Sequence, residues 1–154
     1  MKLKLKQFLF DSFSFLFSRF IIHTLMHTPQ IWGNKKRLKA AKTSSLNNTL
    51  VNLVSGEVII GENVFFGHSC MIITGTHDYF KFGFERKDFF PKSGRNIIIE
   101  DGVWIGSGVI ILGPCFIGKD SVIGAGTLVV SGSNIPEKSI VLGVPGRIIK
   151  KIEK

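Results

Sequence analysis

The chain has 154 residues, of which 44% are hydrophobic and 17 are glycine, and this composition excludes an intrinsically disordered protein. Its two cysteines, Cys70 and Cys115, are too few for a disulfide framework or a four-cysteine metal site. The net charge is +9, but residues 1–42 hold nine Lys and Arg against one acid, whereas residues 43–154 hold eleven against ten, so the excess positive charge belongs to the N-terminal segment.

Residues 1–45 are predicted to form a basic, phenylalanine-rich helical segment. Six phenylalanines lie between residues 8 and 20, and apolar residues at i, i+4, i+7 and i+8 favour one stripe along a helix that ends at Pro29. Asp11 and Arg19 interrupt the apolar run, so no uncharged stretch of about 18 residues is present to span a bilayer. A basic start is typical of a secretory signal, but no small-x-small cleavage site follows it.

Two interpretations of this segment stay open. In one, the helix packs on the domain or on a neighbouring subunit. In the other, residues 1–42 make peripheral membrane contact, with the lysines of residues 2–6 and the basic cluster of residues 35–42 facing anionic headgroups. His23 and His27 are predicted to be an ordinary helical pair, because no third metal ligand is in view. Nucleic-acid binding is not predicted, since the basic residues are interleaved with phenylalanine and match no known binding motif.

The rest of the chain repeats with a period of six residues. From residue 99 an aliphatic residue recurs at every sixth position, and a mostly small residue follows four positions after it. The aliphatic positions are Ile99, Ile105, Ile111, Ile117, Ile123, Val129, Ile135 and Val141, and an earlier block has Val54, Ile60, Phe66 and Ile72. Val54 and Ile99, the first aliphatic positions of the two blocks, are 45 residues apart, which is not a multiple of six. An insertion at about residues 75–96 is therefore predicted.

A six-residue unit indicates a short strand followed by a corner. A helix would repeat every 3.6 residues and a lone strand every two, so neither explains the pattern. In a corner unit the large aliphatic side chain points inward, glycine permits the turn, and the small residue fits the crowded corner. No unit can bury its own apolar face, so the units must stack. The predicted fold class of residues 46–145 is an all-β solenoid.

Two stretches, GVWIGSGVIILGPCFIGKDSVIGAGTLV at residues 102–129 and GVPGRIIKKI at residues 143–152, resemble the hexapeptide-repeat acyltransferases, especially galactoside, maltose and xenobiotic acetyltransferases. The resemblance runs from Gly61 to about Lys151. It implies a left-handed parallel β-helix of about four triangular coils, about 19 Å high at roughly 4.8 Å per layer. It also implies a C-terminal tail or short helix at residues 146–154, and homotrimers with active sites between neighbouring subunits.

The resemblance implies that acetyl-CoA is the co-substrate and that His77, in TGTHDY, is the catalytic residue. An imidazole titrates near neutral pH and can take the proton from a sugar hydroxyl as the oxygen attacks the thioester. The transfer implied is direct, in a ternary complex, with a backbone N–H or another fixed donor holding the oxyanion. A covalent route through Cys70 or Cys115 is not predicted, because both occupy the small inward position of a hexad, where a thiol is an apolar filler.

The same resemblance implies two further groups of site residues. Acetyl-CoA is expected to contact a coil edge and a basic pair at Trp104, Ser107, Gly124, Ala125, Gly126, Arg147 and Lys150. Trp104 is equally open to interpretation as a contact between subunits. The acceptor is expected to meet Asn47, thirty residues before His77, and Asp78 and Tyr79, which begin an aromatic insertion. The lysine that many relatives carry before the strand leading to Pro136 is replaced here by residues 130–133, VSGS.

The function predicted from the resemblance is O-acetylation of a sugar hydroxyl. The expected location is the cytoplasm, where acetyl-CoA is available, at the inner membrane face, with surface-polysaccharide sugars or their precursors as acceptors. N-acetylation of an amino sugar and a non-catalytic β-helix scaffold or binding module remain alternatives. A zinc site of the γ-type carbonic anhydrase kind is not predicted, because it needs three histidines and the solenoid has only His68 and His77.

Overall fold

The computed structural model describes the backbone of residues 2–153 and the side chains of Lys6 and residues 9–153. The side chains of Lys2 and Lys4, which the membrane interpretation of the sequence uses, and of Phe8, one of the six phenylalanines, lie outside the described part. The rest of the N-terminal segment and the whole solenoid can be compared with the predictions.

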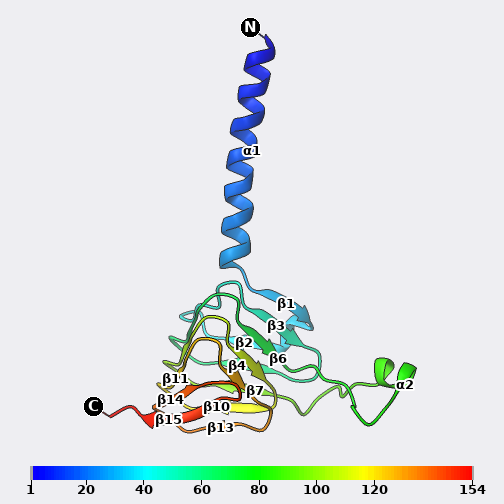
Figure 1. Ribbon diagram of the computed structural model, residues 1–154, viewed down its shortest axis with the longest axis vertical. Coiled ribbons are helices and arrows are strands. Elements are labelled where there is room, and N and C mark those ends of the chain that lie inside the picture. Colours follow the sequence, from blue (N-terminus) through cyan, green and yellow to red (C-terminus); the bar gives the residue numbers. More distant parts are fainter. Residues whose placement is uncertain (1, 154) are drawn as a thin grey trace.

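Three β-sheets, here called A, B and C, wrap around one apolar core (Figure 1). Sheet A contains β1 (Gln30–Gly33), β3 (Leu50–Leu53), β6 (Met71–Ile73), β9 (Ile110–Leu112) and β12 (Leu128–Val129). Sheet B contains β2 (Leu38–Ala40), β4 (Val58–Ile60), β7 (Ile97–Ile99), β10 (Cys115–Ile117) and β13 (Asn134–Ile135). Sheet C contains β5 (Phe65–Phe66), β8 (Trp104–Ile105), β11 (Val122–Ile123), β14 (Ser139–Leu142) and β15 (Arg147–Lys151). From β3 to β14, each turn of the chain adds one parallel strand to each sheet, which is the predicted parallel solenoid.

The hexad residues stack on one another inside the prism. All eight aliphatic positions from residue 99 to residue 141 are buried, with at most 5% of their surface exposed. Ile72 pairs in register with Ile111, and Ile111 pairs with Val129, so one column of branched side chains runs through sheet A. The position after the aliphatic residue lies close to the next coil. At Gly106, for example, a Cβ would lie 2.5 Å from the backbone nitrogen of Ala125. Close stacking of coils therefore requires the glycine.

The prediction that Val54 points into the core is wrong. Leu53 fills the inward position with 0% exposure, and Val54 is half-buried outside it. Val51 and Leu53 both face inward from β3, and side chains alternate along a strand, so residue 54 turns away from the core.

The solenoid begins at Gln30, ahead of the boundary expected at residue 46. β1 pairs in parallel with β3, and β2 pairs with β4, so they add a coil to the four that run from β3 to β14. The paired residues Gln30 and Leu50 are 20 positions apart, whereas three hexads would place them 18 apart. A search for a six-residue period therefore does not detect this coil.

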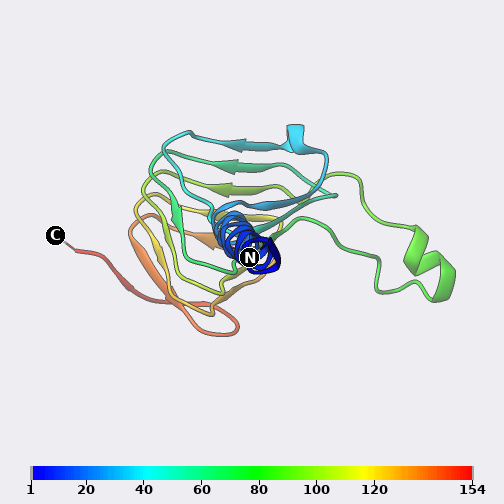
Figure 2. The ribbon, with the colours of Figure 1, turned by 90° about the horizontal axis from the view of Figure 1, so that it is seen from above.

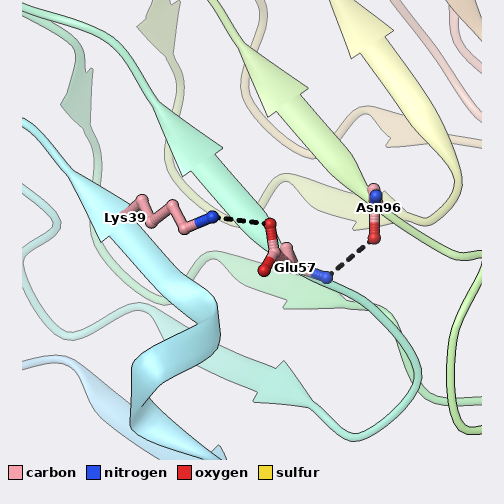
Figure 3. Close-up of polar contacts among 3 residues, drawn as sticks. All are labelled: Lys39, Glu57 and Asn96. Atoms are coloured by element: carbon pink, nitrogen blue, oxygen red, sulfur yellow. Dashed lines mark hydrogen bonds and ion pairs between the residues drawn. The ribbon is translucent and has the colours of Figure 1, made fainter.

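Polar contacts join this first coil to the two that follow. Lys39 on β2 forms a 2.8 Å ion pair with Glu57, whose backbone N–H donates to Asn96 Oδ1 at 2.9 Å (Figure 3). Lys39 lies within β2, and Glu57 and Asn96 directly precede β4 and β7 of the same sheet, so these contacts tie three successive coils together along the stacking direction.

Where a C-terminal tail or short helix was expected at residues 146–154, the described residues to 153 contain the strand β15 and no helix. β15 runs antiparallel to β14, with a bulge between Ile140 and Val141. Gly143 has φ +100, so the chain can reverse there, and the two isoleucines that follow favour a strand. A hairpin therefore covers the last coil of sheet C.

The predicted insertion leaves the solenoid after β6 and returns at β7. It carries the short helix α2 (Gly83–Asp88) and extends away from the prism (Figures 1 and 2). Arg95 closes the base of the loop, because its Nε donates to the carbonyl of Thr74 at 2.7 Å. The insertion is thus anchored where it departs and folds separately beyond that point.

The N-terminal helix α1 (Lys2–His27) rises from the first coil and stands clear of the solenoid (Figure 1). Judged by length and composition alone, the stretch Leu9–His27 could cross a membrane even with Asp11 and Arg19 in it. None of this stretch is buried, so the helix does not pack on its own solenoid. A 3-10 turn, η1 (Lys35–Arg37), follows β1, at the end of that strand away from the helix.

Candidate active site

His77 is held in one orientation by a hydrogen bond from its ring. Its Nδ1 lies 2.7 Å from the backbone carbonyl oxygen of Arg86 in α2. Because a carbonyl oxygen can only accept, Nδ1 must carry the hydrogen, and in the neutral ring Nε2 keeps the lone pair. The ring also meets Phe90 edge-on, with 6.0 Å between the centroids. His77 is therefore presented as a base at Nε2.

The side chain of Arg86 supports this arrangement from the other side. Its Nε donates to the carbonyl of Lys81 at 2.6 Å and its Nη2 to the carbonyl of Tyr79 at 3.1 Å. The guanidinium also lies over the ring of Phe82, 5.1 Å from its centroid. One residue thus fixes the insertion and supplies the carbonyl that orients His77, which sequence analysis did not predict.

A pocket of about 380 Å³ opens beside His77. Its walls are formed by Trp32, Asn52, Val54, Gly75, Thr76, His77 and Phe90. Trp32 on β1 pairs in register with Asn52 on β3, which pairs with Ile73 at the end of β6. The pocket therefore combines the first coil, the second coil and the insertion, and the indole of Trp32 is 70% exposed.

Asn52 is the asparagine that lines this pocket. Its Oδ1 accepts hydrogen bonds from the backbone nitrogens of Val54 and Gly75, both at 3.1 Å. With the oxygen engaged in this way, the amide NH₂ is the group that Asn52 can offer to a ligand. Neither Trp32 nor Asn52 was predicted, and the 20-residue spacing between them is the signal that could have indicated them.

The three residues predicted to meet the acceptor have different surroundings. Asn47, with φ +45, donates from Nδ2 to the carbonyl of Phe66 at 2.6 Å and does not line the His77 pocket. Asp78 is half-buried and its Oδ1 accepts from the backbone nitrogen of Phe80 at 3.0 Å. Tyr79 is 75% exposed and packs on Phe80, with ring centroids 4.2 Å apart. Asp78 and Tyr79 thus shape the start of the insertion beside His77.

The residues predicted along the acetyl-CoA edge do come together. Ser107 follows β8 and residues 124–126 follow β11, so both lie at the corner where sheet C passes to sheet A. The backbone nitrogen of Gly126 donates to the carbonyl of Ser107 at 2.9 Å, so the two corners stack. Ser107, Ala125 and Gly126 are exposed and Gly124 is half-buried, and they leave backbone groups accessible along one edge.

Trp104 and the basic pair lie on sheet C, next to this corner. Trp104 is 49% exposed on β8 and stacks on Phe65, with 5.9 Å between centroids and 16° between planes. Arg147 and Lys150 are exposed on β15, at the other end of the same sheet. An extended ligand along this edge would meet the indole and the two cations together.

His77 and the predicted acetyl-CoA edge occupy different corners of the prism. His77 follows sheet A, where the chain turns toward sheet B, whereas Ser107 and Ala125 precede sheet A. Each side of the prism has about six residues, which span up to about 20 Å at about 3.3 Å per residue, so the two corners are about that far apart. One chain alone therefore does not bring the imidazole to this edge.

Comparison with known proteins agrees with this architecture. The sequence family described as bacterial transferase hexapeptide (six repeats) matches residues 96–131, and the hexapeptide repeat of succinyl-transferase matches residues 57–77. The crystal structure of a maltose O-acetyltransferase from Clostridium difficile 630 is 30% identical, with a TM-score of 0.56, over 81% of this chain and 67% of that one. The chain belongs to the hexapeptide-repeat transferase family.

Other relatives of this chain are named as acetyltransferases. The galactoside O-acetyltransferase of Lactococcus lactis is 36% identical over 113 residues, 71% of this chain and 49% of the relative. A hexapeptide-repeat acetyltransferase of Vibrio cholerae, solved with acetyl coenzyme A, is 25% identical with a TM-score of 0.55, over 89% of this chain and 78% of that one. Serine acetyltransferases and N-acetyltransferases of a tetrahydropyridine dicarboxylate also match. The chain spans about half the length of the curated relatives it matches.

In this hexapeptide-repeat transferase both cysteines are core residues. Cys70 is 1% and Cys115 is 7% exposed, at the small inward positions predicted for them. Burial raises the pKa of the Cys70 thiol, and it raises the pKa of Cys115 to about 12. Both are protonated at neutral pH, and a thiol is a poor nucleophile. Within the described residues, no three His, Cys, Asp or Glu side chains form a group suited to a metal ion.

Proposed function

We propose that this protein transfers an acetyl group from acetyl-CoA to a hydroxyl of a sugar, with His77 as the general base. The observation that carries the proposal is the hydrogen bond from His77 Nδ1 to the Arg86 carbonyl, which leaves Nε2 free beside the pocket. A base must be oriented before it can accept a proton, and this contact supplies the orientation.

The transfer is direct and needs no covalent intermediate on the protein. The Nε2 lone pair of His77 takes the proton of the acceptor hydroxyl while the oxygen attacks the thioester carbonyl. The tetrahedral intermediate then expels the CoA sulfur, which receives the proton from the imidazolium. One C–O bond forms, one C–S bond breaks, and His77 returns to its neutral state.

Acetyl-CoA binds along the corner of Ser107 and residues 124–126, with Arg147 and Lys150 near its phosphates. The acetyl-CoA complex of the Vibrio cholerae relative supports this co-substrate. Since this edge and His77 lie at different corners of one prism, the active site is formed between neighbouring subunits of a homotrimer. Sedimentation equilibrium should then give three times the 17.1 kDa mass of the chain.

A sugar ring fits the acceptor pocket by its chemistry. Pyranose rings present apolar C–H faces between their hydroxyls, and Trp32 and Phe90 supply aromatic walls next to the base. The NH₂ of Asn52 can donate to a hydroxyl on the same ring. The galactoside and maltose acetyltransferases among the relatives support this acceptor class. We place the reaction in the cytoplasm, where acetyl-CoA is available.

Free CoA thiol release tests this function directly. The full chain is incubated with acetyl-CoA and a panel of galactosides, maltose, nucleotide sugars, amino sugars and serine. Release should accelerate with neutral sugars. Acceleration by serine alone would show that the acceptor is the hydroxyl of an amino acid rather than of a sugar. Acceleration by amino sugars alone would indicate N-acetylation. Release that no acceptor accelerates would favour a non-catalytic role.

Substitution of the two tryptophans should affect the KM values of the two substrates differently. Trp32→Ala removes an aromatic wall worth about 1.5–3 kcal/mol, so the KM for the sugar should rise about 10–100-fold while the KM for acetyl-CoA stays unchanged. Trp104→Ala is the matched control and should raise the KM for acetyl-CoA alone. If Trp104 is instead a subunit contact, its removal should lower the sedimenting mass. Equal effects of the two changes on both KM values would contradict the assignment of the pocket.

A further inference from the structure

The helix α1 is apolar on all sides rather than along one stripe. Phe13, Phe15 and Phe17 are 66%, 60% and 53% exposed, and residues two apart on a helix point about 200° away from each other. Leu9, Phe10, Leu16, Phe20, Ile22 and Leu25 are also more than half exposed. A helix that lies flat in a membrane interface needs a distinct polar face, and this one lacks it. Apolar surface all round indicates a helix surrounded by an apolar medium.

The length of the apolar stretch matches the thickness of a bilayer. Leu9–His27 comprises 19 residues, and none of them is buried. At about 1.5 Å per residue this stretch is about 28 Å long, close to the roughly 30 Å of hydrocarbon in a typical bilayer. A bundle of three such helices in a trimer would cover only the inward side of each, and the outward phenylalanines would still require lipid.

Basic residues are exposed on the first coil of the solenoid, away from the point where the helix enters it. Lys35 and Lys36 in η1 are exposed, as is Lys42, and all three belong to the first coil, from which α1 rises (Figures 1 and 2). Two other cations of this cluster have protein partners. Arg37 donates to the carbonyls of Leu53 and Val54, and Lys39 pairs with Glu57. Exposed lysines on the coil that carries an apolar helix complement anionic headgroups.

We propose that α1 is inserted in an anionic phospholipid bilayer and holds the first coil of the solenoid against the membrane surface. The basic cluster of residues 35–42 has five Lys and Arg, more than the three lysines of residues 2–6, and this excess favours a solenoid on the cytoplasmic side. Arg19 lies near the middle of the stretch, with its guanidinium over the ring of Phe15. A central arginine opposes insertion, and the apolar residues around it outweigh it.

Vesicles distinguish insertion from surface contact. The full chain is reconstituted with phosphatidylcholine vesicles containing phosphatidylglycerol, floated on a density gradient, and then washed with high salt and with alkaline carbonate. An inserted helix stays with the vesicles through both washes. Release by carbonate would overturn insertion, and recovery in the buffer fraction from the start would overturn membrane binding altogether. A protein recovered from membranes with a mass that lacks α1 would also overturn it, because α1 would then be a removed leader.

Substitutions in the full chain make the test specific. Phe17→Asp and Phe20→Asp, near the middle of the stretch, should each lower vesicle retention about 100-fold or more, and Arg19→Leu should raise it. Phe80→Asp and Phe84→Asp change more exposed rings in the insertion and should leave retention unchanged. Lys35→Gln and Lys36→Gln should each weaken binding to anionic vesicles about five-fold and binding to neutral vesicles little. Equal losses from both pairs of phenylalanines would contradict the proposal.

Discussion

Replacing His77 with glutamine is expected to lower the turnover number for acetyl transfer by about 10²–10⁴-fold, because the reaction would lose the proposed general base. Glutamine can still donate a hydrogen bond toward the Arg86 carbonyl that now orients the ring, so the pocket should keep its shape. The KM values for acetyl-CoA and for the sugar should therefore change little. Release of free CoA thiol, measured at saturating concentrations of both substrates, gives the turnover number.

His68 provides a matched control for this substitution. It is the other histidine of the solenoid, and its Nδ1 is buried without a hydrogen-bond partner, next to the ring of His27 at 6.2 Å between centroids. It lies outside the residues that line the His77 pocket. His68→Gln should leave the turnover number close to that of the natural protein. Equal turnover in the natural protein and in His77→Gln would show that another group removes the proton.

Mixed trimers test whether two subunits share one site. Ala125→Trp should block the exposed corner of the acetyl-CoA edge without touching His77. When inactive His77→Gln chains and inactive Ala125→Trp chains are unfolded, mixed and refolded together, about one quarter of the sites should combine an intact histidine with an intact edge. Recovery of activity after mixing is the expected result. No recovery, despite mixed trimers of the right mass, would place the whole site in one chain.

Ile111→Ala is expected to lower the free energy of unfolding by about 2–5 kcal/mol. Ile111 is 0% exposed and lies in register between Ile72 and Val129, so truncation leaves a cavity that strands held on both sides cannot fill by moving. Chemical denaturation at fixed protein concentration measures the loss, because subunit assembly would otherwise shift the midpoint.

Ile149→Ala makes the same chemical change outside the core. Ile149 is 58% exposed on β15, so its removal takes little apolar surface from the folded state. The free energy of unfolding should fall by less than about 1 kcal/mol. If the two variants lost the same stability, the column of stacked hexad residues could not be the main source of that stability.

The interior of the solenoid was predictable because the hexads are local and periodic. Ile99, Ile105 and Ile111 are six residues apart, and each is buried as the repeat requires. The place of the insertion was also predictable, because a break in the register between two blocks can be counted in the sequence. Where the period changes, prediction failed. Val54 was assigned to a core position that Leu53 fills. The residues of β15 were expected to form a tail or short helix, because one strand of a hairpin has no repeat of its own.

The amino-acid sequence by itself determined the kind of fold, its core, the position of the insertion and the histidine at its start, since each depends on residues close together in the chain. Only the tertiary structure decided what surrounds that histidine. Trp32 and Asn52 reach His77 through strand pairing across coils, and Arg86 does so through the folding of the insertion. The tertiary structure also places His77 at a different corner of the prism from Ser107 and Ala125, because the path of the chain around three sheets decides the corner at which each residue lies.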